Sequence, residues 1–555
     1  MSRRERHYVG KIFQVLSLHP SRVGALIILA LFLAFSEAMS VGLLLPIAEI
    51  LTSANMDDSV LPSWILARVT WSTESLQLFI LLVFAGAIFV KTVVSLSNVY
   101  LLSVFSEVLR RDLSERYMND YYFSDLSKIS KSAALNATLT EAAQVAKLSR
   151  DVIDLFVSAL VTVSIVIIMV YISPTVVFGV VSFVLIAHLA DRLYLRKLSI
   201  SLGNRRVEIN QLIASRLREL IEAIVEVRTL KLFEFSKTYI SGAFKGYGRT
   251  IGLISIMRVI TAKIVELIIG LSFVVLALVV IYNGRTGFSI GELGVIFLGM
   301  LRIGTHASNA YGLILSISNK LPSLNQFVEV INRDLRDGAP SKPAVEKPSY
   351  LKISEVGGSL GEGVSVALRE YCIERGKLNL IVGKSGTGKS TLCHILAGLR
   401  GAESFSVVFA DGVTLDQKDF LNRVNTVFVP QEQNFFDLSV EDNIRLPERS
   451  GNVNVDVVLS RLGLNEWMNK HRHSIVGDGG LNPSVGQMRR LAIARALLSD
   501  PDLLIIDEPT AGLDSNSEKD VTTFIEELSS FMLVLVVTHS ELLMSRSHNI
   551  YTLDG

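Results

Sequence analysis

The residues best suited to chemistry lie in a glycine-rich segment, Ile381 to Leu392 (IVGKSGTGKSTL). It matches the phosphate-binding pattern G-x-x-x-x-G-K-[ST], known as a P-loop. Glycines let backbone N–H groups approach phosphate oxygens, the lysine places a positive charge at the β- and γ-phosphates, and the serine hydroxyl can bind Mg²⁺. The segment predicts a nucleotide-phosphate site comprising Gly383, Lys384, Ser385, Gly386, Thr387, Gly388, Lys389, Ser390 and Thr391.

The flanking sequence argues against an accidental match in a surface loop. Leu378 to Val382 is an apolar run typical of a buried strand, and Thr391 to Leu399 has a helical pattern. A strand followed by this loop and a helix is the context in which a P-loop binds phosphate at a helix N-terminus.

Two adjacent carboxylates follow another apolar strand, in DLLIIDEPT (Asp502 to Thr510). Asp507, at the strand end, is suited to hold Mg²⁺. Glu508 is suited to accept a proton from a water molecule that attacks the γ-phosphate. Adjacent acids are common on protein surfaces, but four preceding hydrophobic residues place this pair at the end of a buried strand.

Two more polar residues follow predicted strands. Gln431, in VFVPQEQ, follows Val427 to Val429, and its neutral amide could reach both Mg²⁺ and the attacking water. His539, in VVTHS, follows Met532 to Val537 and could contact the γ-phosphate. A single histidine is more often structural, but a position at the end of such a strand favours a role in catalysis.

Composition places much of the chain in a membrane. Half of the 555 residues are hydrophobic, the net charge is +1, and the mean hydropathy is +0.43. Such a charge gives no indication of a nucleic-acid partner. The two cysteines, Cys372 and Cys393, are too few for a disulfide framework and favour a reducing compartment.

Six apolar segments are long enough to cross a hydrocarbon core of roughly 30 Å. The basic N-terminus precedes the first, which is too long for a signal peptide. An even number of spans puts the N-terminus and the nucleotide site on one side, the cytosol, and arginine-rich connections near 106–151 and 191–250 agree. We expect both connections to be helical extensions of the spans. The segments are Val23–Leu51, Leu76–Phe105, Val152–Ile172, Thr175–Ala190, Ile251–Tyr282 and Ile290–Ile317.

Ionisable residues inside these segments suggest function, because charges in lipid are costly and usually face a cavity or a helix bundle. For Glu37 and Lys91, near mid-span, we expect a position lining a cavity, although the sequence does not identify their partners. For Arg258 and Lys263, extension of the side chain toward the membrane surface is the alternative that we favour. The others are Glu266, Arg302 and His306.

The predicted organisation is an all-α six-helix transmembrane domain (1–333), a proline-containing linker (334–350), and an α/β P-loop domain (351–555). In the last part, strand-like and helical runs alternate, which favours a largely parallel sheet.

With the segment NPSVGQMRRLAIARALL (Asn482 to Leu498), these motifs resemble the ATP-binding cassette (ABC) family, in its half-transporter exporter layout. The resemblance implies ATP and Mg²⁺ as cofactors, Gln431 as the Q-loop residue, Glu508 as the catalytic glutamate and His539 as the switch histidine. It also implies a second chain, whose signature segment faces this chain's P-loop. The signature residues here are Ser484, Gly486 and Gln487.

Two departures from the family pattern bear on function. The signature, usually L-S-G-G-Q, is Pro483-Ser484-Val485-Gly486-Gln487, so a branched side chain stands where the backbone must approach phosphate. The position expected to hold an adenine-stacking aromatic falls near Leu360. The altered signature slightly favours a heterodimer over a homodimer, because it would then impair only one of the two ATP sites.

The family resemblance predicts export or flipping of a substrate across a bacterial cytoplasmic membrane, with lipids, lipid-linked glycans, peptides and small amphiphiles all open. Ser36 to Leu51 weakly resembles the first spans of lipid-linked oligosaccharide flippases. The alternative is an ATP-binding membrane regulator or gating subunit that does not pump. Glu508 and His539 favour export, because a gating protein can lose both.

Overall fold

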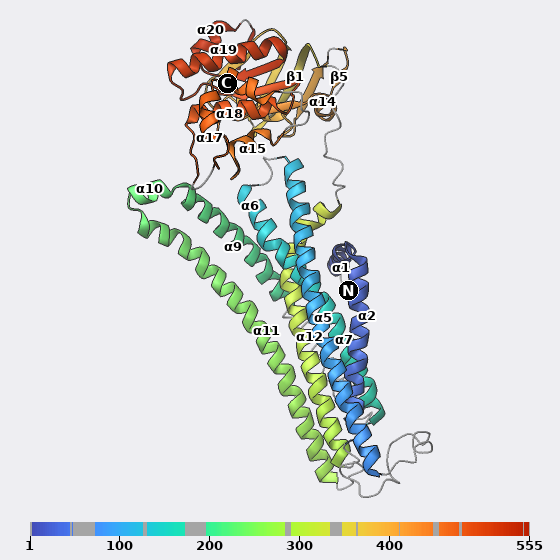
Figure 1. Cartoon of the computed structure of the whole chain (residues 1–555). Helices are drawn as coiled ribbons and strands as arrows, with labels where there is room; N and C mark the ends of the chain where they lie inside the picture. The colour runs from blue at the N-terminus through green and yellow to red at the C-terminus, as the bar shows by residue number, and fades with distance from the viewer. Residues whose placement is uncertain are drawn as a thin grey trace. The chain divides into compact units, whose positions relative to one another are not determined.

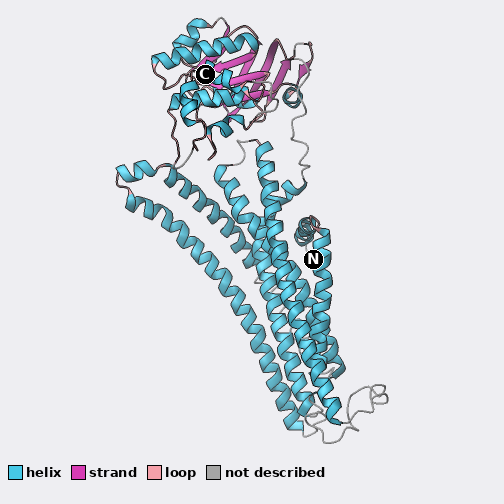
Figure 2. Ribbon diagram, viewed as in Figure 1, coloured by secondary structure: helices cyan, strands magenta, loops and turns pink. Residues whose placement is uncertain are grey.

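The structure is a computed structural model that describes residues 3–44, 47, 73–125, 130–172, 196–283, 290–332, 347–361, 364–409, 411–447, 454–476, 480–547 and 549–553. The chain forms two compact units, one of Met1–Tyr122 with Ser130–Leu335, the other of Phe123–Ile129 with Arg336–Gly555. Figure 2 shows helices throughout the first unit and strands only in the second. The predicted fold class, an all-α part followed by an α/β part, is confirmed.

Long helices make up the first unit (Figure 1). Pro20 occupies the first turn of α2, where its missing N–H is tolerated. The helices are α1 (Arg3–Leu16), α2 (Pro20–Gly42), α5 (Thr73–Phe123), α6 (Lys131–Asn136), the π-helical turn η2 (Ala137–Glu141), α7 (Ala142–Ile172), α9 (Arg196–Glu222), α10 (Ile224–Thr229), α11 (Phe233–Asn283) and α12 (Ile290–Asn332).

By length and composition, three helical stretches of the described residues could cross a membrane: Pro20–Gly42, Leu78–Phe123 and Lys131–Tyr171. They contain most of the first three predicted spans. The fifth and sixth lie on α11 and α12, whereas Thr175–Ala190 lies outside the described residues. The predicted helical extensions are confirmed where the chain is described, since α5 continues without a break to Phe123.

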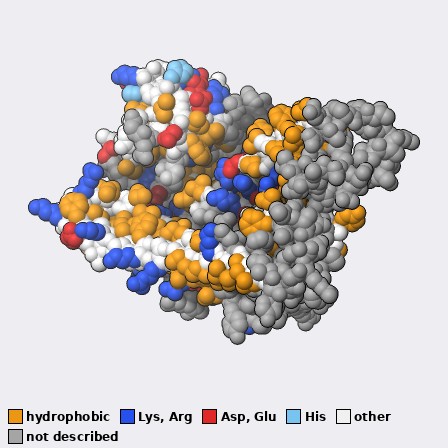
Figure 3. Space-filling view, turned by 90° about the horizontal axis from the view of Figure 1, so that it is seen from below, with side chains coloured by type: hydrophobic (Ala, Val, Ile, Leu, Met, Phe, Trp, Pro, Cys, Tyr) orange, Lys and Arg blue, Asp and Glu red, His pale blue; other side chains and the backbone are white. Residues whose placement is uncertain are grey.

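The surfaces of the long helices fit a lipid environment. Phe89 of α5 and Leu267 of α11 have exposed fractions of 71% and 62%, and Figure 3 shows many hydrophobic side chains at the surface. Exposed apolar groups over this length are unfavourable in water and favourable in a bilayer. The buried side of the unit is formed by α2, α7 and α12, with Ala30, Ile165 and Met300 in its core.

Two buried charged pairs hold α12 in this unit. Arg206 of α9 lies 3.7 Å from Glu141 of η2, and its guanidinium donates to Ser323 Oγ at 2.8 Å. One turn before Ser323 on α12, Lys320 pairs with Asp151 of α7 at 2.5 Å. Burial lowers the pKa of Arg206. Such pairs join these helices through specific partners as well as through apolar packing.

The second unit contains two sheets. The strands of the parallel sheet run in the order β6-β7-β8-β3-β9, and an antiparallel sheet has the order β2-β1-β4-β5. Only the parallel sheet was predicted from the sequence. The strands are β1 (Tyr350–Gly361), β2 (Val364–Glu374), β3 (Asn379–Gly383), β4 (Ser404–Val408), β5 (Thr414–Leu415), β6 (Thr426–Val429), β7 (Leu503–Asp507), β8 (Leu533–Val537) and β9 (Asn549–Leu553).

Helices and the second sheet cover the two faces of the parallel sheet. Alternate residues of β7 point to opposite faces, so Leu504 and Ile506 join one core and Leu503 and Ile505 the other. All five residues of β7 and of β8 are buried, as central parallel strands require. The helices are α13 (Lys389–Leu396), α14 (Gln417–Arg423), α15 (Val440–Arg445), α16 (Val455–Arg461), α17 (Asn465–His471), α18 (Val485–Leu497), α19 (Ser515–Phe531) and α20 (Glu541–Arg546).

Candidate ATP-binding site

The P-loop connects β3 to α13. Gly388, the residue before α13, has φ +94°, a conformation that residues with a Cβ rarely adopt. At Gly383 an added Cβ would lie 2.6 Å from the Leu553 carbonyl oxygen. Glycine is therefore required at both positions for different reasons: backbone conformation at Gly388 and close packing against β9 at Gly383.

Lys389 lies under this loop. Its side chain is buried, and Nζ donates to the carbonyl oxygens of Gly383 at 2.7 Å and Lys384 at 2.9 Å. An ammonium group has three donor hydrogens, so one remains for a phosphate oxygen in this geometry. The lysine thus braces the loop and brings a positive charge to it.

Two of the three residues predicted to bind Mg²⁺, Ser390 and Asp507, meet at the start of α13. Ser390 Oγ donates to Asp507 Oδ2 at 2.8 Å, joining α13 to the end of β7. A hydroxyl and a carboxylate oxygen are ligands that Mg²⁺ accepts alongside phosphate and water. This pair fits a magnesium site, and the positive-φ glycines with the buried Lys389 fit a triphosphate.

Glu508 follows Asp507 in a constrained conformation. Its φ is +48°, unusual for a residue with a side chain, and its N–H donates to Val537 O at 2.9 Å. Strain of this kind concentrates at functional sites. Burial raises the pKa of Glu508, and Asp507 acts in the same direction, while His539 acts against both. A carboxylate with a raised pKa is a better proton acceptor.

His539 lies beside this carboxylate. Its Nε2 is 3.6 Å from Glu508 Oε1, and its side chain is half exposed. The strand register explains the proximity, because Asp507 of β7 lies opposite Val537 of β8. Glu508 and His539 therefore follow neighbouring parallel strands at the same edge of the sheet.

Gln431 also lies at this edge, since Val429 of β6 is opposite Ile506 of β7. Its side chain is exposed, and in the described part of the chain no hydrogen bond joins it to Ser390, Asp507 or Glu508. The structure thus brings Ser390, Asp507, Glu508 and His539 together, whereas Gln431 shares their edge without contact.

The signature residues form a helix start of their own. Ser484 caps α18, with a capping box in which Ser484 N–H donates to Gln487 Oε1 at 2.9 Å. Pro483 is buried, whereas Val485 is 60% exposed. A Cβ at Gly486 would lie 3.1 Å from Leu513 Cδ2. Ser484 and Gln487 thus bond to each other, while Val485 presents its branched side chain outward.

Arg489 is a residue of the site that was not predicted from the sequence. This buried residue of α18 donates through Nη1 to Ala511 O, three residues beyond Glu508. Burial lowers the pKa of Arg489, while Glu508 acts to raise it. The spacing with Ala492 and Ala496, at i+3 and i+7, could have predicted that Arg489 rather than Arg490 faces inward. The arginine links the signature helix to the segment after Glu508.

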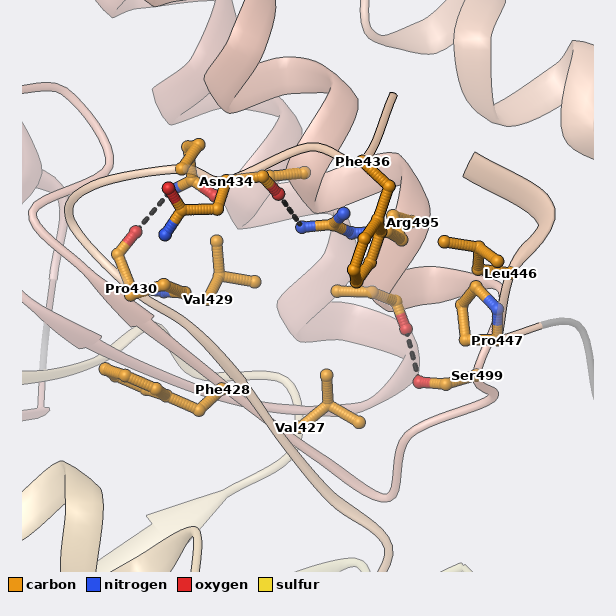
Figure 4. Close-up of a pocket in the computed structure, with 13 residues that line it drawn as sticks. Val427, Phe428, Val429, Pro430, Asn434, Phe436, Leu446, Pro447, Arg495 and Ser499 are labelled. Carbon is orange, nitrogen blue, oxygen red and sulfur yellow. Dashed lines mark hydrogen bonds between the residues drawn. The ribbon is translucent and has the colours of Figure 1, made fainter. Parts of the chain in front are cut away.

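A pocket of about 480 Å³ lies away from the phosphate site, between β6 and α18 (Figure 4). Arg495 crosses it, donating to Asn434 O at 3.1 Å and lying 4.7 Å from the centre of the Phe435 ring. No P-loop residue lines it, so the ATP site is defined by its polar groups and not by this pocket.

The fold and site define a membrane-type helical unit joined to a P-loop nucleotide-binding unit. Residues 369–511 match the ABC transporter family model. The structure of a bacterial Atm1-family ABC exporter with ATP bound superposes with a TM-score of 0.75, covering 97% of this chain and 94% of that one at 16% identity. Residues 369–511 of the nucleotide-binding unit are therefore similar to ABC transporters, and the chain has the fold of that exporter.

Curated relatives match over part of their length. A glutathione/L-cysteine transport system ATP-binding/permease protein, CydC of Escherichia coli, is 31% identical over 33% of this chain and 32% of its own. An ATP-dependent lipid A-core flippase of Burkholderia thailandensis is 28% identical over 51% of this chain and 48% of its own. The chain thus spans between a third and a half of these relatives' length.

Proposed function

We propose that this chain is one half of an ATP-driven exporter or flippase. The observation that carries the proposal is the convergence of Lys389, the Ser390–Asp507 pair and the Glu508–His539 pair at one edge of the sheet. These groups bind triphosphate, hold a divalent cation and accept a proton. Because the same chain contains long apolar helices, we infer that ATP hydrolysis at this site drives the movement of a substrate across the membrane.

In this mechanism each residue has one role. Lys389 and the P-loop N–H groups bind and orient the phosphates, and Ser390 and Asp507 would hold Mg²⁺, which neutralises charge on the β- and γ-phosphates. Glu508 accepts a proton from the attacking water. His539 stabilises the developing charge at the γ-phosphate, and Gln431 would reach the water and the cation from the end of β6.

The working assembly that we propose contains two chains, with Ser484, Gly486 and Gln487 of this chain completing the partner's ATP site and the partner's signature segment completing the ATP site of this chain. The start of α18 supports this role: the capping box uses the N–H groups of Ser484 and Gln487, and the first-turn N–H groups of Val485 and Gly486, which have no partner within a helix, can face an anion. The outward Val485 supports a heterodimer slightly more than a homodimer. In a heterodimer it would weaken only the ATP site that contains the partner's P-loop, whereas in a homodimer it would weaken both sites. Adenine stacking stays a prediction, since the side chain of Leu360 is outside the described residues.

The cargo that we propose is a lipid, lipid-linked glycan, peptide or small amphiphile crossing a bacterial cytoplasmic membrane, with the N-terminus and ABC domain cytosolic. The relatives, named for lipid A-core flipping and for glutathione/L-cysteine transport, support this range. We further propose the division into a membrane domain (1–333), a linker (334–350) and an ABC domain (351–555). The boundary between the compact units, after Leu335, supports it.

The test is phosphate release by the purified chain in lipid nanodiscs. Glu508→Gln should still bind ATP but hydrolyse it at least about 100-fold more slowly, as expected when a general base is lost. The matched control, Glu541→Gln, removes an exposed carboxylate near His539 and should leave turnover unchanged. Equal turnover in wild type and Glu508→Gln would overturn the assignment. ATP binding without hydrolysis in the wild-type chain would favour the gating alternative.

A further inference from the structure

Four ionisable side chains from three helices meet inside the membrane-type unit. Glu37 of α2 pairs with Lys91 of α5, and it lies 3.3 Å from Arg302 Nη1 and 3.5 Å from His306 Nε2, both on α12. Ser40, one turn after Glu37, donates to its carboxylate at 3.4 Å. We call these residues, without Ser40, the Glu37 cluster. The sequence predicted Glu37 and Lys91 individually but not their pairing.

The cluster lies at membrane depth. Lys91 and Arg302 lie 15 and 12 residues into apolar segments that begin at Leu76 and Ile290, which corresponds to roughly 20 Å along a helix. The hydrocarbon core is roughly 30 Å thick, so the cluster lies inside the core, about 10 Å from the surface farther from these segment starts. Charges at such depth are costly and mark substrate pathways when they face an aqueous cavity or the bundle interior.

The charges do not balance. One carboxylate faces a lysine and an arginine, plus a histidine that adds a third positive charge when protonated. Among the residues that the structure describes, no second carboxylate forms an ion pair with Lys91, Arg302 or His306. A network serving only to stabilise helix packing would be expected to have equal numbers of positive and negative groups, because a charge taken out of water is penalised unless it is fully paired.

The exposed fractions of the side chains indicate which positive group can contact a ligand. The Glu37 side chain is 5% exposed and Lys91 18%, so these two form the enclosed part of the cluster. Arg302 is 49% exposed. Its guanidinium carries five N–H donors, and one nitrogen is engaged with Glu37. A planar, half-exposed guanidinium is suited to bidentate binding of phosphate or carboxylate.

We propose that the Glu37 cluster binds an oxyanion group, phosphate or carboxylate, of the transported substrate, with Arg302 as the main contact and Lys91 and His306 adding positive charge. Glu37 positions these cations and competes with the substrate for them. The cargo is therefore an anionic molecule, and this inference rests on the proposed export function. The anionic group can belong to a bilayer lipid or to a soluble solute.

A binding assay that needs no ATP separates this inference from the export proposal. Melting temperature of the detergent-purified chain is measured with short-chain phosphatidate and with the matching diacylglycerol, which lacks only the phosphate. The soluble arm compares glutathione with its dimethyl ester, which lacks the carboxylates. A ligand that binds the folded state raises the melting temperature with concentration. We expect stabilisation by at least one anion and by neither neutral analogue.

Substitutions of Arg302 and of Glu37 should change the affinity for the anion in opposite directions. Arg302→Gln should weaken anion binding about tenfold, since a charge-assisted contact is lost, and Arg302→Lys should retain part of it. Glu37→Gln should strengthen binding, because it removes the competing carboxylate. Changes in the same direction for Glu37→Gln and Arg302→Gln, or no stabilisation by either anion, would overturn the proposal. Lys91→Met provides a second weakening variant if Arg302→Gln does not fold.

The outcome for ATP hydrolysis is read separately. If the anion binds with these opposite effects but stimulates no phosphate release in nanodiscs, the site stands and the export proposal fails. If the wild-type chain hydrolyses ATP but no anion binds, the proposed anion site fails and the export proposal stands.

Discussion

Ser390 and Asp507 form a hydrogen bond of 2.8 Å although 117 positions separate them in the sequence. Ser390 is the second residue of α13 and Asp507 is the last residue of β7, so neither element alone would place them together. The parallel order β7-β8-β3 brings the end of β7 to the same edge as the P-loop. The contact joins the residue that follows Lys389 to the carboxylate that precedes Glu508.

Lys389→Ala should weaken ATP binding without unfolding the nucleotide-binding unit. The variant loses a charge-assisted contact to phosphate, worth roughly 1.5–3 kcal/mol, or about a 10- to 150-fold rise in Kd. Binding of a fluorescent ATP analogue checks this. Lys418→Ala, which removes an exposed lysine of α14, is the control and should bind as wild type does. An unchanged Kd for Lys389→Ala would remove this lysine from the site.

ATP hydrolysis should fall on acidification at a higher pH than an ordinary glutamate would give. Glu508 must be deprotonated to accept a proton, and burial raises its pKa. Lowering the pH therefore protonates it before it would protonate a solvent-exposed glutamate, whose pKa is about 4.3. His539→Gln should move this acidic limb to still higher pH, because His539 opposes the raised pKa. A pH–rate profile of phosphate release would show both shifts. If the acidic limb of the profile lies at the same pH in His539→Gln as in the wild type, His539 does not affect the pKa of Glu508.

Restoring the signature should test the asymmetric assembly. If the partner is a different chain, the wild-type chain alone should hydrolyse ATP weakly, and Val485→Gly with Pro483→Leu should raise the rate severalfold. Pro483 is buried, so each substitution should also be made singly. Val485→Ala controls for helix propensity, since glycine in a helix costs about 1 kcal/mol relative to alanine. Robust hydrolysis by the lone wild-type chain, with no gain on restoration, would support the homodimer.

Removing Arg206 should destabilise the helical unit. Arg206→Leu leaves Glu141 buried without its cation, which typically costs about 3–5 kcal/mol, whereas Arg205→Leu changes an exposed neighbour and should cost little. Thermal melting in detergent compares the two. The double variant Arg206→Leu, Glu141→Leu should recover part of the loss. Equal melting temperatures for Arg205→Leu and Arg206→Leu would mean that the buried pair contributes nothing measurable.

Local pattern was enough to predict the strands that carry the site. Four buried runs were predicted within one residue of the observed starts of β3, β6, β7 and β8, because apolar runs flanked by glycine or polar residues have few alternatives to a buried parallel strand. The role of the P-loop glycines was equally predictable from the sequence. Their spacing reflects a local backbone conformation and the close approach of the backbone to phosphate, and it does not depend on contacts with distant segments. The antiparallel sheet was not, because Tyr350 to Gly361 contains glycines and charges that weaken its alternation.

Partners across long sequence separations were decided by tertiary structure alone. The sequence marked Glu37 and Lys91 as costly in lipid but could not pair them, because helix packing and rotation determine which side chains meet. The sequence also did not distinguish Arg206 from the other basic residues of the connection near 191–250. Only the packing of α9 shows that Arg206 is buried beside Glu141. Residue type and spacing thus determined which groups could bind phosphate or hold charge. Strand order and helix contacts determined which of them meet, since those depend on the simultaneous burial of distant segments.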